Sequence, residues 1–175
     1  MTGPALVWFR HDLRLADNKQ RQIVNELTER RGDILVEGEN LVLAGLLDRR
    51  SPDVQPHAER LLERLQRAYP DRYRELYVLD PATARILGAG TGNGVGTVFP
   101  VPALVASAAL PGTAELVEQL DLPSGPSLAI ARQIRVQAPD GPGRTVGIIV
   151  ALLDPQHFLD DDMGGAGDDR NAGSA

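Results

Sequence analysis

The sequence predicts an α+β fold in which helices come first and antiparallel hairpins follow. Three observations support this: an amphipathic helical pattern early in the chain, short apolar runs after residue 70, and two longer apolar runs near the end joined by a segment rich in glycine and proline. The apolar spacing thus changes from a helical period to that of a strand. Helices and strands in separate parts of a chain are typical of the α+β class.

A long N-terminal helix is expected over residues 20–50, where Leu27, Ile34 and Leu41 recur every seven residues. Three glycines lie inside this range, and each costs about 1 kcal/mol relative to alanine in a helix interior. Such a helix needs packing to persist, so we expect it to pack against a second copy, as a homodimer, or against the domain's own sheet. A second, amphipathic helix is expected over residues 57–69.

The second half of the chain is expected to form two hairpins. The expected strands are short apolar runs bounded by turn residues: 74–80, 85–88, 127–136 and 144–153. The last two are joined by a loose turn over residues 138–143. Between the hairpins, residues 99–120 combine proline with alanine-rich sequence and are expected to form short helices.

The glycine-rich segment over residues 88–96 resembles a phosphate-binding loop only in composition. In each frame of the dinucleotide fingerprint the third glycine is missing, and Asn93, Val95 or Thr97 stands in its place. No lysine follows, and Pro100 lies where the receiving helix would begin. We therefore expect a flexible connection and no nucleotide cofactor.

Composition limits the function to a few classes. A chain of 175 residues is about one domain. The net charge of -6 and an aromatic content of 4% argue against nucleic-acid binding. No apolar run is long enough to cross a bilayer. The chain has no cysteine, its three histidines are not spaced as metal ligands, and it has no Gly-x-Ser-x-Gly motif. We expect a protein that is not an enzyme and needs no metal or cofactor.

Arg132 is the most informative single residue. In the strand expected over residues 127–136 it shares a face with apolar side chains. These are Leu128, Ile130, Ile134 and Val136. A cation on an apolar face is costly unless it is paired or bound by a ligand. Two interpretations remain open: a buried ion pair or snorkelling arginine, and an arginine that binds a carboxylate or phosphate through two parallel hydrogen bonds.

The segment Val7-Trp-Phe-Arg-His-Asp-Leu-Arg-Leu-Ala-Asp-Asn18, within residues 4–18, resembles the first strand and turn of the photolyase and cryptochrome family. This resemblance implies a truncated, cytoplasmic α/β antenna domain without the flavin domain, in which residues 7–9 form a central strand of a parallel sheet. It covers about a tenth of the chain.

Residues 18–160 resemble a Cache domain, the PAS-like extracytoplasmic sensor of bacterial histidine kinases, diguanylate cyclases and chemoreceptors. The residues that carry this resemblance are Glu75-Leu-Tyr-Val-Leu-Asp-Pro-Ala-Thr-Ala-Arg-Ile-Leu-Gly-Ala-Gly90, the strand segment 125–136 and the final segment 143–158. It implies an antiparallel PAS-like sheet with flanking helices that binds a small organic ligand. In place of the aromatic and arginine motif of amino-acid-binding members, this chain has Phe99-Pro-Val-Pro-Ala-Leu-Val105.

The Cache resemblance explains far more of the chain, so we interpret the protein as a ligand-sensing domain and keep the photolyase-like domain as the alternative. The expected ligand contacts are Arg132 as anchor for an anionic group, Tyr77 as a hydroxyl donor and Phe99 as an apolar wall. The expected division is an appended segment over residues 1–18, a Cache-like domain over 19–160 and a disordered acidic tail over 161–175.

Overall fold

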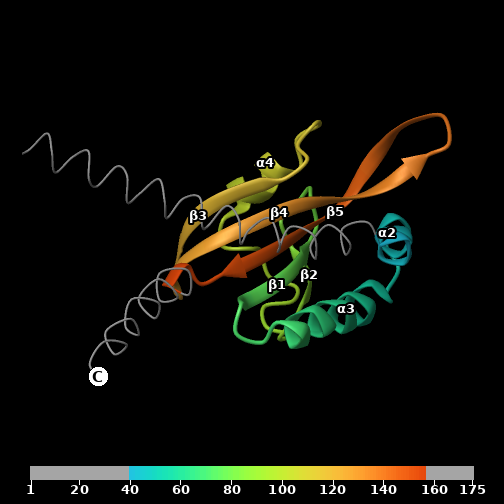
Figure 1. Cartoon of the computed structure of the whole chain (residues 1–175). Coiled ribbons are helices and arrows are strands. Elements are labelled where there is room, and N and C mark those ends of the chain that lie inside the picture. The colour runs from blue at the N-terminus through green and yellow to red at the C-terminus, as the bar shows by residue number, and fades with distance from the viewer. Residues whose placement is uncertain (1–39, 157–175) are drawn as a thin grey trace, which may run out of the picture. The chain divides into compact units, whose positions relative to one another are not determined.

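The computed structural model describes residues 40–156, which form a five-stranded antiparallel sheet with helices on both faces (Figure 1). The strand order is β2-β1-β5-β4-β3, and each neighbouring pair is antiparallel. In chain order the elements are α2 (Leu41–Asp48), α3 (Val54–Ala68), β1 (Tyr73–Leu79), β2 (Ile86–Ala89), α4 (Pro102–Ala108), β3 (Leu116–Leu122), β4 (Gly125–Ala138) and β5 (Gly141–Leu153). This architecture confirms the predicted α+β class and antiparallel sheet.

The central strand is β5, which pairs with β1 on one side and β4 on the other. Every residue from Gly147 to Leu153 is buried. Both faces of this strand are therefore covered, and this explains why its sequence is a continuous apolar run rather than an alternating one. The run is the longest apolar stretch of the second half, and the hairpin that it forms with β4 was predicted.

The two faces of the sheet pack against different helices. On one face α4 joins a core that includes Ala129 and Ala131 of β4, together with Phe99 from the loop before α4. On the other face Leu47 of α2 and Ile134 of β4 both lie close to Gly147. Because side chains of a strand alternate between faces, neighbouring residues of β4 belong to different cores.

Helix α3 packs closely against the sheet through one apolar side. Its buried residues are Val54, Ala58, Leu61, Leu62 and Leu65, at the spacing of a helix face. At Gly88 of β2 an added Cβ would lie 2.7 Å from the Cβ of Ala58, so the closeness of helix and strand requires glycine there. The helix predicted over residues 57–69 is confirmed, and it begins three residues earlier.

The long helix predicted over residues 20–50 is interrupted at Asn40. This residue is extended (φ -64°, ψ 109°), and its side chain accepts a hydrogen bond from the backbone N–H of Leu43 at 2.9 Å. An asparagine that caps a helix in this way begins it, so α2 is a separate helix of eight residues. Leu41 is 80% exposed. The rest of the predicted helix lies outside the described residues, and the homodimer stays a prediction.

Two other expectations are corrected. The short helices expected over residues 99–120 end with α4, and Leu116–Leu122 is the edge strand β3, paired along its length with β4. The polar residues of this segment suit an exposed edge as well as a helix, and pairing with β4 decides between them. The turn expected to be loose over residues 138–143 is tight, because Ala138 pairs with Gly141 and only residues 139 and 140 lie between them. A register shift between Val136 and Ala138 comes just before this turn.

The predicted appended segment and acidic tail, and the photolyase-like strand at residues 7–9, lie outside the described residues.

Candidate functional site

A groove lies at the end of the sheet where β1 finishes and β5 begins. Its volume is about 580 Å³, which is within the range of sites that hold small molecules. Three segments line it: the link between α2 and α3, the turn between β1 and β2, and the start of β5. The lining residues are Leu47, Asp48, Arg50, Ser51, Val54, Asp80, Pro81, Ala82, Thr83, Leu87, Arg144, Thr145 and Val146.

The lining combines apolar side chains with charged and hydroxyl groups. Leu47 and Val54 are buried and supply apolar surface, and Leu87 and Val146 add to it. Two arginines, two aspartates, one serine and two threonines supply polar groups. A mostly apolar surface with a few convergent polar groups is typical of a ligand site.

Arg50 has an unusual backbone conformation at the end of α2. Its N–H donates to the carbonyl of Leu47 (3.1 Å), and the N–H of Ser51 donates to the carbonyl of Leu46 (3.0 Å). This pair of bonds is a Schellman motif, in which the first residue after the cap takes the left-handed conformation and is usually glycine. Arg50 has φ 50°. The left-handed region costs a residue with a Cβ about 1–2 kcal/mol.

Some of the charged side chains that line the groove have a partner in the protein and others do not. Arg144 forms an ion pair with Asp48 of α2, and the two charges offset each other. Asp80 accepts a hydrogen bond from the hydroxyl of Thr83 at 2.5 Å. Within residues 40–156, the Arg50 guanidinium takes part in none of the hydrogen bonds or ion pairs of the structure. Arg50 therefore carries the one cationic group of this lining that has no partner in the described chain.

Two of the predicted ligand contacts, Tyr77 and Phe99, lie together. Their rings meet edge to face with centroids 5.5 Å apart, on the face of the sheet that α4 covers. Phe99 is 1% exposed. Burial raises the pKa of Tyr77 above its ordinary value, and the nearby Glu75 charge raises it further. The roles of these residues in ligand binding stay predictions.

Glu75 connects this face to the glycine-rich segment. It is buried, and its carboxylate accepts hydrogen bonds from the backbone N–H of Leu76 (3.0 Å), the backbone N–H of Thr91 (3.2 Å) and the hydroxyl of Thr91. The segment expected to be a flexible connection is thus held to β1 at Thr91. Gly92 then takes a left-handed conformation that glycine adopts without strain.

Arg132 lies on the opposite face of the sheet from Tyr77 and Phe99. Its neighbour Ala131 belongs to the core under α4, so Arg132 points to the side of α2 and α3. Its guanidinium is 3.9 Å from the carboxylate of Glu115, and the two side chains are 22% and 14% exposed. The fold therefore does not bring the three predicted contacts into one site. Arg132 has the ion-pair partner that one interpretation required, and its role as a ligand anchor stays a prediction.

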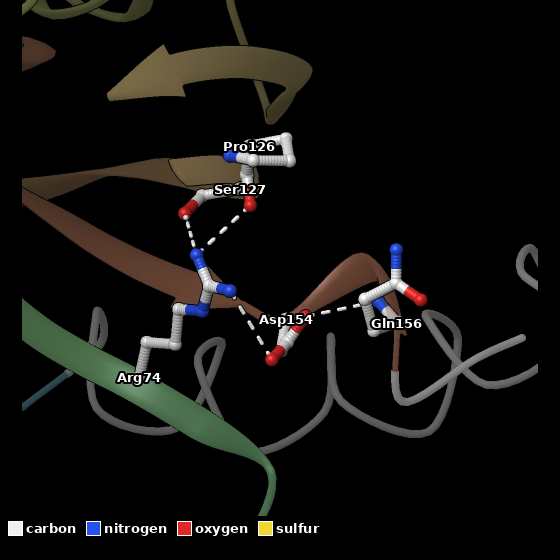
Figure 2. Close-up of polar contacts among 5 residues, drawn as sticks. All are labelled: Arg74, Pro126, Ser127, Asp154 and Gln156. Atoms are coloured by element: carbon white, nitrogen blue, oxygen red, sulfur yellow. Dashed lines mark hydrogen bonds and ion pairs between the residues drawn. The ribbon is translucent and has the colours of Figure 1, made fainter. Parts of the chain in front are cut away.

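At the far end of the sheet Arg74 joins three strands (Figure 2). Its Nη1 donates to the carbonyl of Pro126 (2.9 Å) and to the hydroxyl of Ser127 (3.0 Å), and its Nη2 lies 3.2 Å from the carboxylate of Asp154. Asp154 in turn accepts a hydrogen bond from the N–H of Gln156 at 2.9 Å. This Arg74 network connects β1 with the start of β4 and the end of β5.

No residue of the groove was among the binding residues predicted from the sequence. Its polar groups come from three segments that are about 30 and 60 residues apart in sequence, and only the fold brings them together. The left-handed residue after α2 had no glycine to mark it. Ser51-Pro52 after the helical pattern, a sequence typical of the end of a helix, was the one available signal.

The fold is shared with sensor domains of known structure. It is similar to the sensor domain of the histidine kinase DctB from V. cholerae, with 16% identity, a TM-score of 0.67, and coverage of 90% of this chain and 59% of that chain. Two further similar structures are extracellular domains of proteins assigned as histidine kinases, vpHK1S-Z8 (15% identity, TM-score 0.54, 90% and 63% coverage) and rpHK1S-Z16 (17% identity, TM-score 0.51, 91% and 64% coverage).

At these identities the likeness shows the fold alone, and the chain spans about three fifths of the length of these neighbours. No protein-family model matches the sequence, and no curated protein matches it. Nothing among these similar structures supports the photolyase resemblance. Within residues 40–156, no helix has both the length and the apolar content to cross a bilayer.

Proposed function

We propose that the chain is the ligand-sensing domain of a bacterial signal-transduction receptor and works on the extracytoplasmic side of the membrane. The observation that supports this most strongly is the shared fold: 90% of the chain follows the sensor domain of DctB at a TM-score of 0.67. The output module of the receptor is a histidine kinase, a diguanylate cyclase or a chemoreceptor signalling domain.

The groove supports binding of a small molecule rather than a macromolecule. It is a concave site of about 580 Å³ at one end of a rigid sheet, and its apolar and charged groups suit an organic ligand with a polar head. The lining contains no histidine, cysteine or lysine. Its aspartate, serine and threonine side chains supply hydrogen-bond donors and acceptors for such a ligand.

The residues predicted from the sequence remain part of the proposal as two separate contacts. Tyr77 and Phe99 together form an aromatic wall under α4, which a ligand reaches only if the core on that face opens. Arg132 is a proposed anchor for an anion on the opposite face, in competition with Glu115. Neither contact is needed for binding in the groove.

The test is a thermal-shift screen of the purified chain against small organic molecules of each charge type. A ligand at 100 times its Kd stabilises the folded state by about 2.7 kcal/mol. For a chain of this size that corresponds to a rise in Tm of about 5–10 °C. The expected result is a saturable rise with at least one ligand, checked by calorimetry. If no ligand of any charge type raises Tm, the proposed function is wrong.

A further inference from the structure

Two residues other than glycine have a positive φ within residues 40–156, Arg50 (50°) and Ala84 (58°). Both flank the groove, because Arg50 lines it and Ala84 follows Thr83, which also lines it. Residues held in sparsely populated backbone regions cluster at functional sites. The positive φ of two residues with side chains beside one groove therefore needs a structural or functional cause.

The fold explains Ala84. Its side chain is buried in the core under α4. Its N–H donates to the carbonyl of Asp80 at 2.9 Å, and its carbonyl accepts from the N–H of Phe99 at 2.9 Å. A small apolar residue in this turn completes the core, and that gain offsets the strain of its conformation.

The fold does not explain Arg50 in the same way. Its side chain is exposed and has no partner in the described chain, and glycine would satisfy the Schellman motif without strain. Within residues 40–156 the structure thus shows no hydrogen bond or ion pair by which the arginine side chain offsets this strain. Its position in the groove points to a role in binding.

The surroundings of Arg50 define the chemistry of what it binds. The Arg144 and Asp48 charges offset each other. Among residues 40–156, this leaves Arg50 as the cation without a partner and Asp80 as a carboxylate whose side-chain hydrogen bond comes from the Thr83 hydroxyl. A guanidinium binds a carboxylate through two parallel hydrogen bonds. A carboxylate such as that of Asp80 accepts hydrogen bonds from hydroxyl groups. The carbon atoms of the same ligand would lie on Leu47 and Val54.

We infer that the groove binds a small hydroxycarboxylate, with the acid group held by Arg50 and a hydroxyl group donating to Asp80. This inference rests on the proposed ligand-sensing function and names its ligand class and its anchor. The backbone strain at Arg50 is then retained because the guanidinium is needed at this place.

The central experiment compares the wild type with Arg50→Gly. The probes are D-glucuronate, D-gluconate and L-malate, and D-glucose is the neutral match for D-glucuronate. We expect Arg50→Gly to raise the Tm of the ligand-free protein by about 2 °C, because relief of the left-handed strain exceeds the entropy that glycine adds to the unfolded chain. We expect the same variant to bind the acid at least 10-fold more weakly by calorimetry. A purely structural residue would not give both results.

Two more variants complete the design. Arg50→Lys keeps the charge but loses the planar fork, so binding is expected to weaken about 10-fold. Arg49→Ala is the matched control, since Arg49 has ordinary helical geometry (φ -80°) and does not line the groove. It is expected to bind the acid as the wild type does. D-glucose is expected to leave Tm unchanged.

Each other outcome overturns a defined claim. Equal binding by the wild type and Arg50→Gly, or a lower Tm for that variant, shows that Arg50 is structural and overturns this inference alone. If another ligand of the wider screen binds and none of the three hydroxycarboxylates does, the ligand class is wrong while the sensing function stands. If nothing in either screen binds, both fail.

Discussion

Arg74 and Arg50 lie at opposite ends of the sheet, and their surroundings differ in every respect that matters for an arginine. The Arg74 guanidinium donates to a carbonyl and a hydroxyl and pairs with Asp154, so it joins three strands. The Arg50 guanidinium has no partner in the described chain, and its backbone is strained. The first arginine contributes to the fold, and the second costs stability.

This contrast separates two roles that composition cannot distinguish. A guanidinium whose N–H groups already donate to the protein has few donors left for a ligand. A guanidinium beside a groove that has no protein partner keeps all of its N–H donors for a ligand. Stability and binding should therefore respond oppositely to mutation at the two ends of the sheet. Three tests, each with its own comparison variants, examine this contrast beyond the Arg50 series.

The largest effect is expected for Arg74→Ala. The change removes two charge-assisted hydrogen bonds and an ion pair and leaves the fully buried Ser127 without the partner that the structure gives it. We expect the free energy of unfolding to fall by about 2–3 kcal/mol, measured by urea denaturation. Ligand affinity in the groove should change far less than it does in Arg50→Gly.

The matched control is Arg67→Ala, whose ion pair with Glu63 lies on the exposed side of α3. A pair of this kind contributes about 0.5 kcal/mol or less. If the two variants lose the same stability, the Arg74 network contributes no more than a surface pair and the contrast fails.

A smaller effect is expected for the pair of Arg132 and Glu115, which is intermediate between the two cases. Its charges are partly buried but 3.9 Å apart. A double-mutant cycle with Arg132→Met and Glu115→Gln should give a coupling energy of about 0.5–1 kcal/mol. Coupling of this size would mean that Arg132, like Arg74, stabilises the fold through its partner. Zero coupling together with weaker ligand binding in Arg132→Met would mean that Arg132, like Arg50, serves ligand binding.

The smallest effect concerns Tyr77, which lies on β1 between the two ends. Its pKa is raised from 10.0 by burial first and by the Glu75 charge second. The folded protein thus holds the phenolic proton more tightly than the unfolded chain. The stability that results is fully present below pH 10 and is lost as the pH rises above it.

Tyr77→Phe should therefore flatten the fall in Tm between pH 10 and the folded pKa, measured by calorimetry across this range. Tyr69→Phe, on the end of α3, is the comparison variant for which the alkaline fall should remain. An unchanged slope in Tyr77→Phe would mean that another group controls the alkaline transition.

The sequence correctly predicted the helices and strands in which apolar residues recur with a clear period or in an unbroken run. Helix α3 and the strands β1, β4 and β5 were predicted to within a few residues, because each has one buried side or is buried throughout. Strand β3 was missed because Glu118 and Gln119 suit a helix as well as an exposed edge, and only pairing with β4 decides between these.

The groove could not be predicted in the same way. It depends on the left-handed conformation of Arg50, on the turn that carries Asp80 and on the register that places Arg144 beside Asp48, and none of these has a local sequence signal. Alternation along β4 correctly gave Arg132 an apolar face. It could not tell that Tyr77 and Phe99 belong to the other side of the sheet.

The position of β5 has a mechanical consequence. This strand passes the groove at Arg144 and ends beside Asp154. It pairs with β4 along most of its length, and with β1 from Ile148 to Leu153. The separation of Arg144 and Asp154 along a strand is roughly 30 Å. From Ile148 to Leu153 the strand cannot stretch or buckle without breaking hydrogen bonds in two ladders, so this part moves as one unit. A displacement passed on by Val146 at the groove would therefore reach Asp154 and the Arg74 network at the far end.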